Sequence, residues 1–200
     1  MRYRRNDIVE RAVGILDEYG LADLSMRRIA GELGLQPSAL YHHFANKQEL
    51  LAAVADELLE RGERSDATGL AGEDQVVALS HGLRDAMLAY RDGAELIATV
   101  HAFGLGERRP DERIARAIAL AGADADFARV AAMTVLHFVF GHVSDEQTHL
   151  QAGSDGAIDT ASPGRTEPGR SGADSFALGL SLILAGIRHH QNAEETFSAR

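Results

Sequence analysis

The chain has 200 residues, of which 45% are hydrophobic, and a net charge of −10, which suits one large or two small domains with a sizeable core. It contains no cysteine, which excludes disulfides, thiolate metal sites and cysteine nucleophiles and favours a cytoplasmic location. No apolar run approaches the ~20 residues of a membrane span, and no hydrophobic segment follows the N-terminal arginines, so neither a membrane partner nor a signal peptide is expected.

The charge is unevenly distributed. Residues 1–47 hold seven Arg and Lys against six Asp and Glu, a net +1, whereas the remaining residues carry −11. A slightly basic head on an acidic body suits a protein that presents one end to a polyanion.

The first elements are a basic arm and a scaffold helix. The arm, MRYRR, is either a solvated terminus or a segment that touches phosphate or the minor groove of DNA. The first helix is predicted to begin near Asn6 or Asp7, with Glu10 completing a capping box, and to end at Gly20.

Two short helices joined by a tight turn follow, and the rest of the chain is organised around them. Ser25 caps the first, and Gly34 ends it in a left-handed position. Pro37 begins the second helix at a position where its missing amide would have been unpaired anyway. Leu40 and Phe44, four residues apart, are predicted to anchor the second helix to the first.

The second short helix leaves a polar face exposed. Small, hydroxyl and aromatic residues at an exposed helix start, flanked by Arg27, Arg28 and Lys47, are typical of a helix that enters the DNA major groove. The alternative is a helical hairpin that touches no nucleic acid. The candidate DNA-binding residues are Arg27, Pro37, Ser38, Ala39, Tyr41, His42, His43 and Lys47.

The stretch GLADLSMRRIAGELGLQPSALYHHFANKQELL resembles the N-terminal helix-turn-helix of the tetracycline-repressor (TetR) family of bacterial regulators, especially in LYHHFANKQELL. The similarity runs from about Asp7 to Leu59 and covers the capping, turn, aromatic and lysine positions together. It implies a ligand-responsive transcriptional regulator, a repressor released from double-stranded operator DNA by a small-molecule effector.

After the head, Asn46 and Glu49 form the capping box of a connector helix. Residues 62–73 are a polar, glycine-containing break, so we predict a DNA-binding domain over residues 1–61 and an effector-binding and dimerisation domain over residues 62–200. No strand pattern, repeat or glycine-rich phosphate loop occurs, which indicates an all-α fold without a cofactor. Helices are expected over Val76–Tyr90, Ala94–Phe103, Pro110–Leu120, Asp124–His149 and Ser175–His190.

Residues 151–173 are rich in Gly, Ser, Pro and Asp and are predicted to form a mobile loop, because they cannot bury enough surface to offset their ordering entropy. On either side, LRDAMLAYRDGAEL and LHFVFGHVSDEQTHL resemble the ligand-binding domain of the tetracycline-repressor branch. The resemblance implies a small, mostly apolar effector held among helices. The candidate lining residues are Leu79, Leu83, Met87, His101, Met133 and His137.

Several positions depart from the drug-binding members of that branch. Gly62 and Glu63 stand where those members have a histidine pair, Leu79 replaces a polar amide, and His101 matches only after an insertion, whereas His137 matches directly. The departures argue against tetracycline itself as the effector.

Other functions have weaker support. His142, Glu146 and His149 are weak metal-binding candidates, because they lie four and three residues apart on one helical face, although such residues are also ordinary at a polar helix end. An enzyme in a helical bundle would need paired motifs on facing helices, so no catalytic residue is assigned. An architectural DNA-binding protein without a ligand would spread positive charge more widely.

The last predicted helix is apolar nearly all round, unlike an ordinary surface helix. We expect it to form a four-helix bundle with Asp124–His149 and the two symmetry mates of a homodimer, so that two heads read half-sites about 34 Å apart or a multiple of it. The alternative is the central helix of a monomeric core. The residues expected at the contact are Leu180 and Leu184, with Gly179, Ser181, Ala185 and Gly186 allowing close approach.

Overall fold

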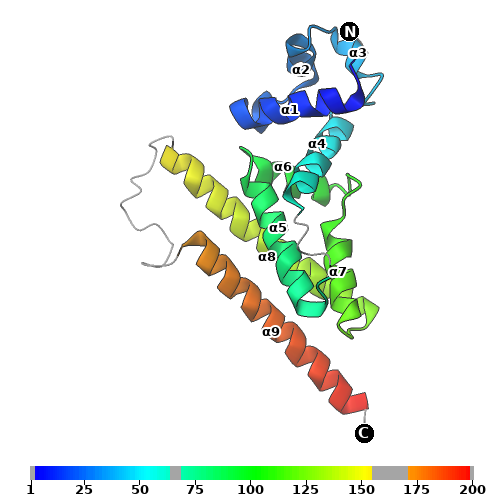
Figure 1. The fold of residues 1–200 in the computed structure, drawn as a ribbon, viewed down its shortest axis with the longest axis vertical. Coiled ribbons are helices and arrows are strands. Elements are labelled where there is room, and N and C mark those ends of the chain that lie inside the picture. Colours follow the sequence, from blue (N-terminus) through cyan, green and yellow to red (C-terminus); the bar gives the residue numbers. More distant parts are fainter. Residues whose placement is uncertain (1–2, 64–68, 155–170, 199–200) are drawn as a thin grey trace. The chain divides into compact units, whose positions relative to one another are not determined.

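The computed structural model describes residues 3–63, 69–154 and 171–198, and every regular element in these ranges is a helix (Figure 1). The all-α prediction is therefore confirmed for this part of the chain. A short 3-10 helix, η1 (Leu21–Asp23), follows the first α-helix. The α-helices are α1 (Arg5–Tyr19), α2 (Met26–Glu32), α3 (Pro37–Leu40), α4 (Lys47–Gly62), α5 (Gly72–Leu88), α6 (Gly93–Ala102), α7 (Pro110–Leu120), α8 (Ala125–Ser154) and α9 (Gly172–Ser198).

The chain folds into two compact units. The first unit joins Met1–Glu63 to Leu83–Arg109, and the second joins Arg64–Gly82 to Pro110–Arg200. Helix α5 contributes to both units, and α6 packs against α4 within the first. The domain boundary after residue 61 remains a prediction, and the grouping of α6 with the helix-turn-helix was not foreseen from the sequence.

Local sequence signals set the helix ends of the head as predicted. The Ser25 hydroxyl accepts the backbone N–H three residues on, at 3.3 Å, and Gly34 follows α2 with φ of 65°. The Asn46 side chain accepts the N–H of Glu49 at 2.8 Å, and the Glu49 carboxylate accepts the N–H of Ala45 at 2.7 Å. These bonds satisfy amides that a helix start leaves unpaired.

The predicted start of α1 is wrong by one or two residues. The Arg4 N–H donates to the Asp7 carboxylate at 2.7 Å, and the helix begins at Arg5. Asp7 therefore occupies the third helical position, and Glu10 lies too far along to cap it. Glu10 instead forms an ion pair with Arg61 of α4.

The core of the first unit forms where α1 packs on α4, α2 on α3 and α4 on α6. Helix α1 also packs against α2, so it contacts both the helix-turn-helix and α4. The large buried side chains of this core include Ile8, Ile15, Leu16, Ile29, Leu50, Val54, Leu58 and Leu96.

In the second unit, α8 packs against both α7 and α9. By length and composition alone, the Ala125–Ala152 stretch of α8 is apolar enough to cross a membrane, but 39% of its most apolar window is buried inside the fold. A core helix passes the same test. The contacts with α7 and α9 bury part of α8 within the second unit.

Helix α9 has two apolar sides, of which only one is covered by its own chain. Phe176, Leu180 and Leu184, spaced four apart, are buried, whereas Leu178 is 42% and Leu182 is 66% exposed. The placement of Leu180 and Leu184 at a partner contact is therefore wrong, because their own subunit already covers them.

The glycines of α9 also differ in their surroundings. A Cβ on Gly179 would lie 2.5 Å from the ring of Phe138 in the same chain, whereas a Cβ on Gly186 would meet no atom within 4 Å. Gly179 thus serves packing between α8 and α9, which corrects its expected role at a partner contact. Gly186 still has open space beside it.

The predicted loop over residues 151–173 is helical at both described ends. Gln151 to Ser154 belong to α8, and α9 begins at Gly172. Residues 155–170 lie outside the described part of the chain, so the prediction of mobility stays a prediction there.

Candidate nucleic-acid interface

Helices α2 and α3 meet at a tight turn beside α1 (Figure 1). At the end of α2, Gly34 N–H donates to the Gly31 carbonyl at 3.2 Å, and Leu35 N–H donates to the Ala30 carbonyl at 2.8 Å. The left-handed φ of Gly34 reverses the chain, and Pro37 begins α3 two residues after Leu35. This arrangement is a helix-turn-helix.

Two buried side chains fix which face of α3 is exposed. Leu40 and Phe44 are 0% and 1% exposed, and the Phe44 N–H donates to the Leu40 carbonyl at 3.0 Å. Both were predicted anchors, and their burial confirms that part of the prediction. Of the candidate DNA-binding residues on this segment, Ser38, Tyr41 and His42 are exposed, whereas Pro37, Ala39 and His43 are half-buried.

The basic residues around the turn fall into two classes. Arg27 and Lys47 are exposed, and neither forms an ion pair with a described residue. Arg28 is held within the fold, because it forms ion pairs with Asp23 at 2.8 Å and Glu32 at 3.5 Å and lies 3.7 Å over the centre of the Tyr19 ring. Arg28 was expected as one of the basic flanks of the binding face, and these intramolecular partners were not foreseen from the sequence.

Lys47 is the first residue of α4, directly after the Asn46 cap. The start of a helix carries partial positive charge from its unpaired amides, which adds to the charge of the lysine. An exposed cation at this position suits a phosphate group.

The connector helix α4 is tied to the turn that follows α6. The Asp56 carboxylate accepts the backbone N–H of Glu107 and of Arg108, each at 2.9 Å. Arg108 in turn forms ion pairs with Glu60 at 2.9 Å and with Glu63. Two successive backbone amides bound by one carboxylate fix the turn against α4.

A second tie joins α6 to the end of α1. Asp92 precedes α6 with φ of 54°, and its carboxylate accepts the N–H of Leu21 at 2.8 Å. Gly20, with φ of 84°, leaves no room for a side chain there, because a Cβ would lie 2.5 Å from the Asp92 carboxylate oxygen. Sequence reasoning missed Asp56 and Asp92, because their partners lie more than fifty residues away in the chain.

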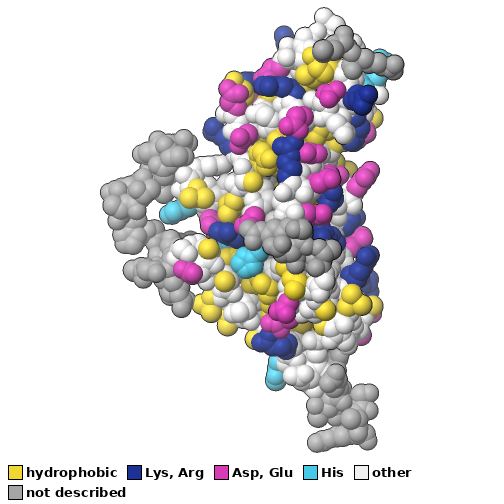
Figure 2. Space-filling view, viewed as in Figure 1, with side chains coloured by type: hydrophobic (Ala, Val, Ile, Leu, Met, Phe, Trp, Pro, Cys, Tyr) yellow, Lys and Arg dark blue, Asp and Glu magenta, His cyan; other side chains and the backbone are white. Residues whose placement is uncertain are grey.

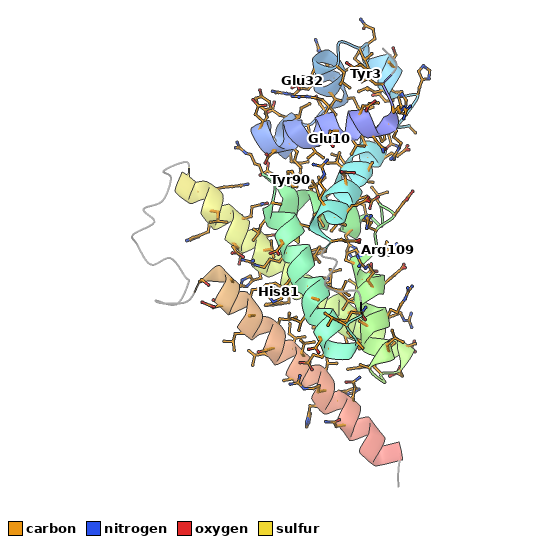
Figure 3. All side chains as sticks on the ribbon, viewed as in Figure 1. Tyr3, Glu10, Glu32, His81, Tyr90 and Arg109 are labelled. Atoms are coloured by element: carbon orange, nitrogen blue, oxygen red, sulfur yellow. The ribbon has the colours of Figure 1, made fainter. Side chains whose placement is uncertain are left out.

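Arg61, near the end of α4, joins three segments of the first unit. It forms ion pairs with Glu57 at 2.7 Å and with Glu10 of α1, and donates to the Tyr90 hydroxyl at 3.1 Å. Two of these partners, Glu10 and Tyr90, are labelled in Figure 3. The hydrogen bond with Tyr90, followed by that with Glu57, raises the pKa of Arg61 above its usual value despite partial burial. Its guanidinium therefore stays charged and committed to these partners.

The candidate effector-binding residues are divided between the two units. Leu83 and Met87 are buried and His101 is half-buried in the first unit. In the second unit, Leu79 and Met133 are half-buried and His137 is exposed on α8. Their assignment as one lining stays a prediction.

Of the weak metal candidates, His142 has partners of another kind. His142 Nε2 lies 3.2 Å from the Gly172 carbonyl oxygen, and its ring contacts those of Phe138 and Phe176. His149 is exposed. Within the described ranges, no three His, Cys, Asp or Glu residues are grouped so that they could hold a metal ion.

Comparison with known proteins covers both ends of the chain. Residues 8–54 match the bacterial regulatory proteins of the tetR family, and residues 71–169 match the tetracyclin repressor-like C-terminal domain. The class A tetracycline repressor protein from transposon 1721 of Escherichia coli is 33% identical over 196 residues, which span 91% of this chain and 89% of that protein.

Two solved structures are similar over nearly their whole length. The crystal structure of Mycobacterium smegmatis BioQ is 41% identical with a TM-score of 0.84, over 94% of this chain and 99% of that one. A crystal structure of BioQ with its double-stranded DNA operator is 38% identical with a TM-score of 0.76, over 93% and 98% of the two chains.

Proposed function

Because the chain belongs to the tetR family of bacterial regulatory proteins, we propose that it represses transcription until a small molecule releases it from its operator. The family consists of ligand-responsive, DNA-binding transcriptional regulators. The observation that carries the proposal is a complete helix-turn-helix in which Ser38 of the second helix, and Tyr41 and His42 directly after it, are exposed. Beside them lie Arg27 and Lys47, two exposed cations that form no ion pair with any described residue. We further propose that the protein works in the cytoplasm and has no enzymatic activity.

The residues of this face divide by the part of DNA that they suit. Ser38 and His42 are exposed on or directly after α3, where short polar side chains reach base edges in the major groove. Tyr41 and Lys47 lie toward the start of α4 and suit phosphate. Pro37, Ala39 and His43 are less exposed and complete the surface.

Regulators of this family act as homodimers, and two helices of the second unit have surfaces that suit a partner. Leu178 and Leu182 are exposed on α9, and Val130 is 66% exposed on α8. Beside them Gly186 leaves open space. We propose that this side of α8 and α9 packs against its symmetry mate, because a two-fold interface would cover these apolar side chains on both subunits.

The hydrogen bonds that join α6 to α4 and α1 support a mechanism by which a bound ligand changes operator affinity. Leu83, Met87 and His101 belong to the same unit as the head, and Asp56 and Asp92 bind the segments around α6 to α4 and α1. A ligand that contacts this part of the unit and favours one arrangement of the two heads would change operator affinity. The effector we propose is small and mostly apolar.

The test is operator binding with and without ligand. Fluorescence anisotropy with duplexes from the DNA upstream of the gene should show sequence-selective binding over an unrelated duplex. A thermal-shift screen of apolar small molecules should then identify ligands that lower operator affinity at saturation, by roughly 5–150-fold.

Each stage can fail separately. If no upstream duplex is preferred over unrelated DNA, the chain is not a specific regulator. If a stabilising ligand leaves operator affinity unchanged, the protein binds DNA independently of that ligand, and the proposed induction is wrong.

A further inference from the structure

Lys and Arg side chains are interspersed with Asp and Glu on the visible surface (Figure 2). The cations of the head, residues 3–63, therefore differ mainly in whether a carboxylate neutralises them. Within residues 3–63, Arg11, Arg28 and Arg61 are neutralised by carboxylates of the same unit. Arg27 and Lys47 form no ion pair with any residue that the structure describes, and both are proposed above to bind DNA. The same property is shared by two further residues, Arg4 and Arg5.

Arg5 is exposed, and its guanidinium lies 4.6 Å from the centre of the Phe44 ring. Phe44 is buried directly behind the turn that ends α3. The stack therefore fixes a positive charge next to the DNA-binding face. Arg5 is not a freely solvated terminal side chain.

Stacking on a ring leaves the hydrogen-bonding edge of a guanidinium available. The contact with the aromatic ring uses the flat face of the group, whereas its N–H donors point outward in the plane. No carboxylate within the described residues occupies those donors. A planar donor edge of this kind matches the oxygens of a phosphate group.

We propose that Arg5 is a phosphate-binding residue and that, with Arg4 beside it, it extends the DNA interface from α3 and Lys47 to the start of α1. The inference rests on the proposed DNA-binding function. Phe44 thus has two roles, since it anchors α3 in the core and holds the Arg5 guanidinium beside it. Because the charge is fixed by a buried ring, Arg5 contacts the backbone and does not read bases.

The experiment measures the salt dependence of DNA binding by the full-length protein. Arg5→Gln keeps a planar group that can pack on Phe44 but removes the charge. On the operator, the slope of log K against log [salt] should fall by about 0.9 for each half-site. Affinity should fall roughly tenfold for each half-site at ~0.1 M salt.

Matched variants separate a phosphate contact from general loss of charge. Arg5→Lys retains the charge and should keep most of the salt slope. Arg11→Gln removes an arginine of the same helix that is paired with Glu32, and Arg116→Gln removes an exposed arginine of α7. Both controls should keep the wild-type slope, and thermal unfolding should show that all four variants are folded.

The same salt slopes should also be measured on an unrelated duplex. This measurement tests the Arg5 phosphate contact even if the proposed regulatory function is wrong. If the wild-type protein shows no operator preference, the regulatory proposal fails, but the slope on unrelated DNA still tests Arg5. A folded Arg5→Gln variant with the wild-type slope on both duplexes would overturn the phosphate contact. A changed base preference would also overturn it, because Arg5 would then read the groove.

Discussion

Leu182→Glu should break the homodimer without unfolding the subunit. Leu182 is 66% exposed on the side of α9 that its own chain leaves uncovered. Complete burial of a leucine contributes about 1.5–3 kcal/mol, so covering the remaining two-thirds would contribute about 1–2 kcal/mol in each subunit. Two-fold symmetry doubles this loss to about 2–4 kcal/mol for the dimer.

The glutamate adds a charge to each side of the interface. Removing an unpaired carboxylate from water costs several kcal/mol more, so the dimer dissociation constant should rise by a factor of about a thousand or more. Sedimentation equilibrium would measure this constant, and circular dichroism would monitor helical content. Operator affinity should fall in parallel although the heads are unchanged.

Two comparisons make this test specific. Leu120→Glu changes a leucine that is 74% exposed on α7, and it should leave the dimer intact. Leu180→Glu places a charge in the core between α8 and α9, where Leu180 is 1% exposed, and should unfold the second unit. A folded Leu182→Glu protein that dimerises like the wild type would refute the proposed face.

Three further substitutions test other parts of the account. Lys47→Ala should weaken binding to all duplexes alike and reduce the salt slope by about one for each half-site, as measured by anisotropy at several salt concentrations. Asp92→Ala should destabilise the protein by roughly 1.5–3 kcal/mol in urea unfolding, because the Leu21 N–H loses a charged acceptor, whereas Asp92→Asn should cost less. Gly179→Ala should cost about 1–3 kcal/mol in the same assay, because its Cβ would lie 2.5 Å from the Phe138 ring, and unchanged stability would contradict that packing.

The parts of the fold that were predicted from the sequence depend on neighbours in the chain. Ser25, Gly34 and Asn46 act on backbone groups within a few residues, so residue type and spacing were enough to place the helix ends. Leu40 and Phe44 were recognised as buried because a short helix beside another has one side on which to place apolar residues.

The parts that were missed depend on distant partners. On α9, Leu178 and Leu182 have the same spacing as Leu180 and Leu184, and only the position of α8 decides which pair is covered. Arg27 and Arg28 are adjacent and chemically identical, yet among the described residues only Arg28 forms ion pairs with carboxylates. Neither difference is present in the local pattern.

The same limit applies to the first unit. The hydrogen bond between the Leu21 N–H and the Asp92 carboxylate joins residues that are 71 positions apart in the sequence. No local pattern of residue types predicts a contact over that separation. The sequence therefore located the helix-turn-helix but not the hydrogen bond that joins the start of α6 to the end of α1.

The central claim is that a dimer presents two exposed α3 faces to DNA, and hydroxyl-radical footprinting on the upstream region tests it most directly. The account predicts two protected segments on one face of the duplex, related by two-fold symmetry and separated by about 10–10.5 base pairs or a multiple of it. The combined substitution of Ser38 and His42 by alanine should abolish the preference for that site while leaving salt-dependent binding to unrelated DNA. A single protected segment, or a wild-type footprint from the double variant, would contradict the claim.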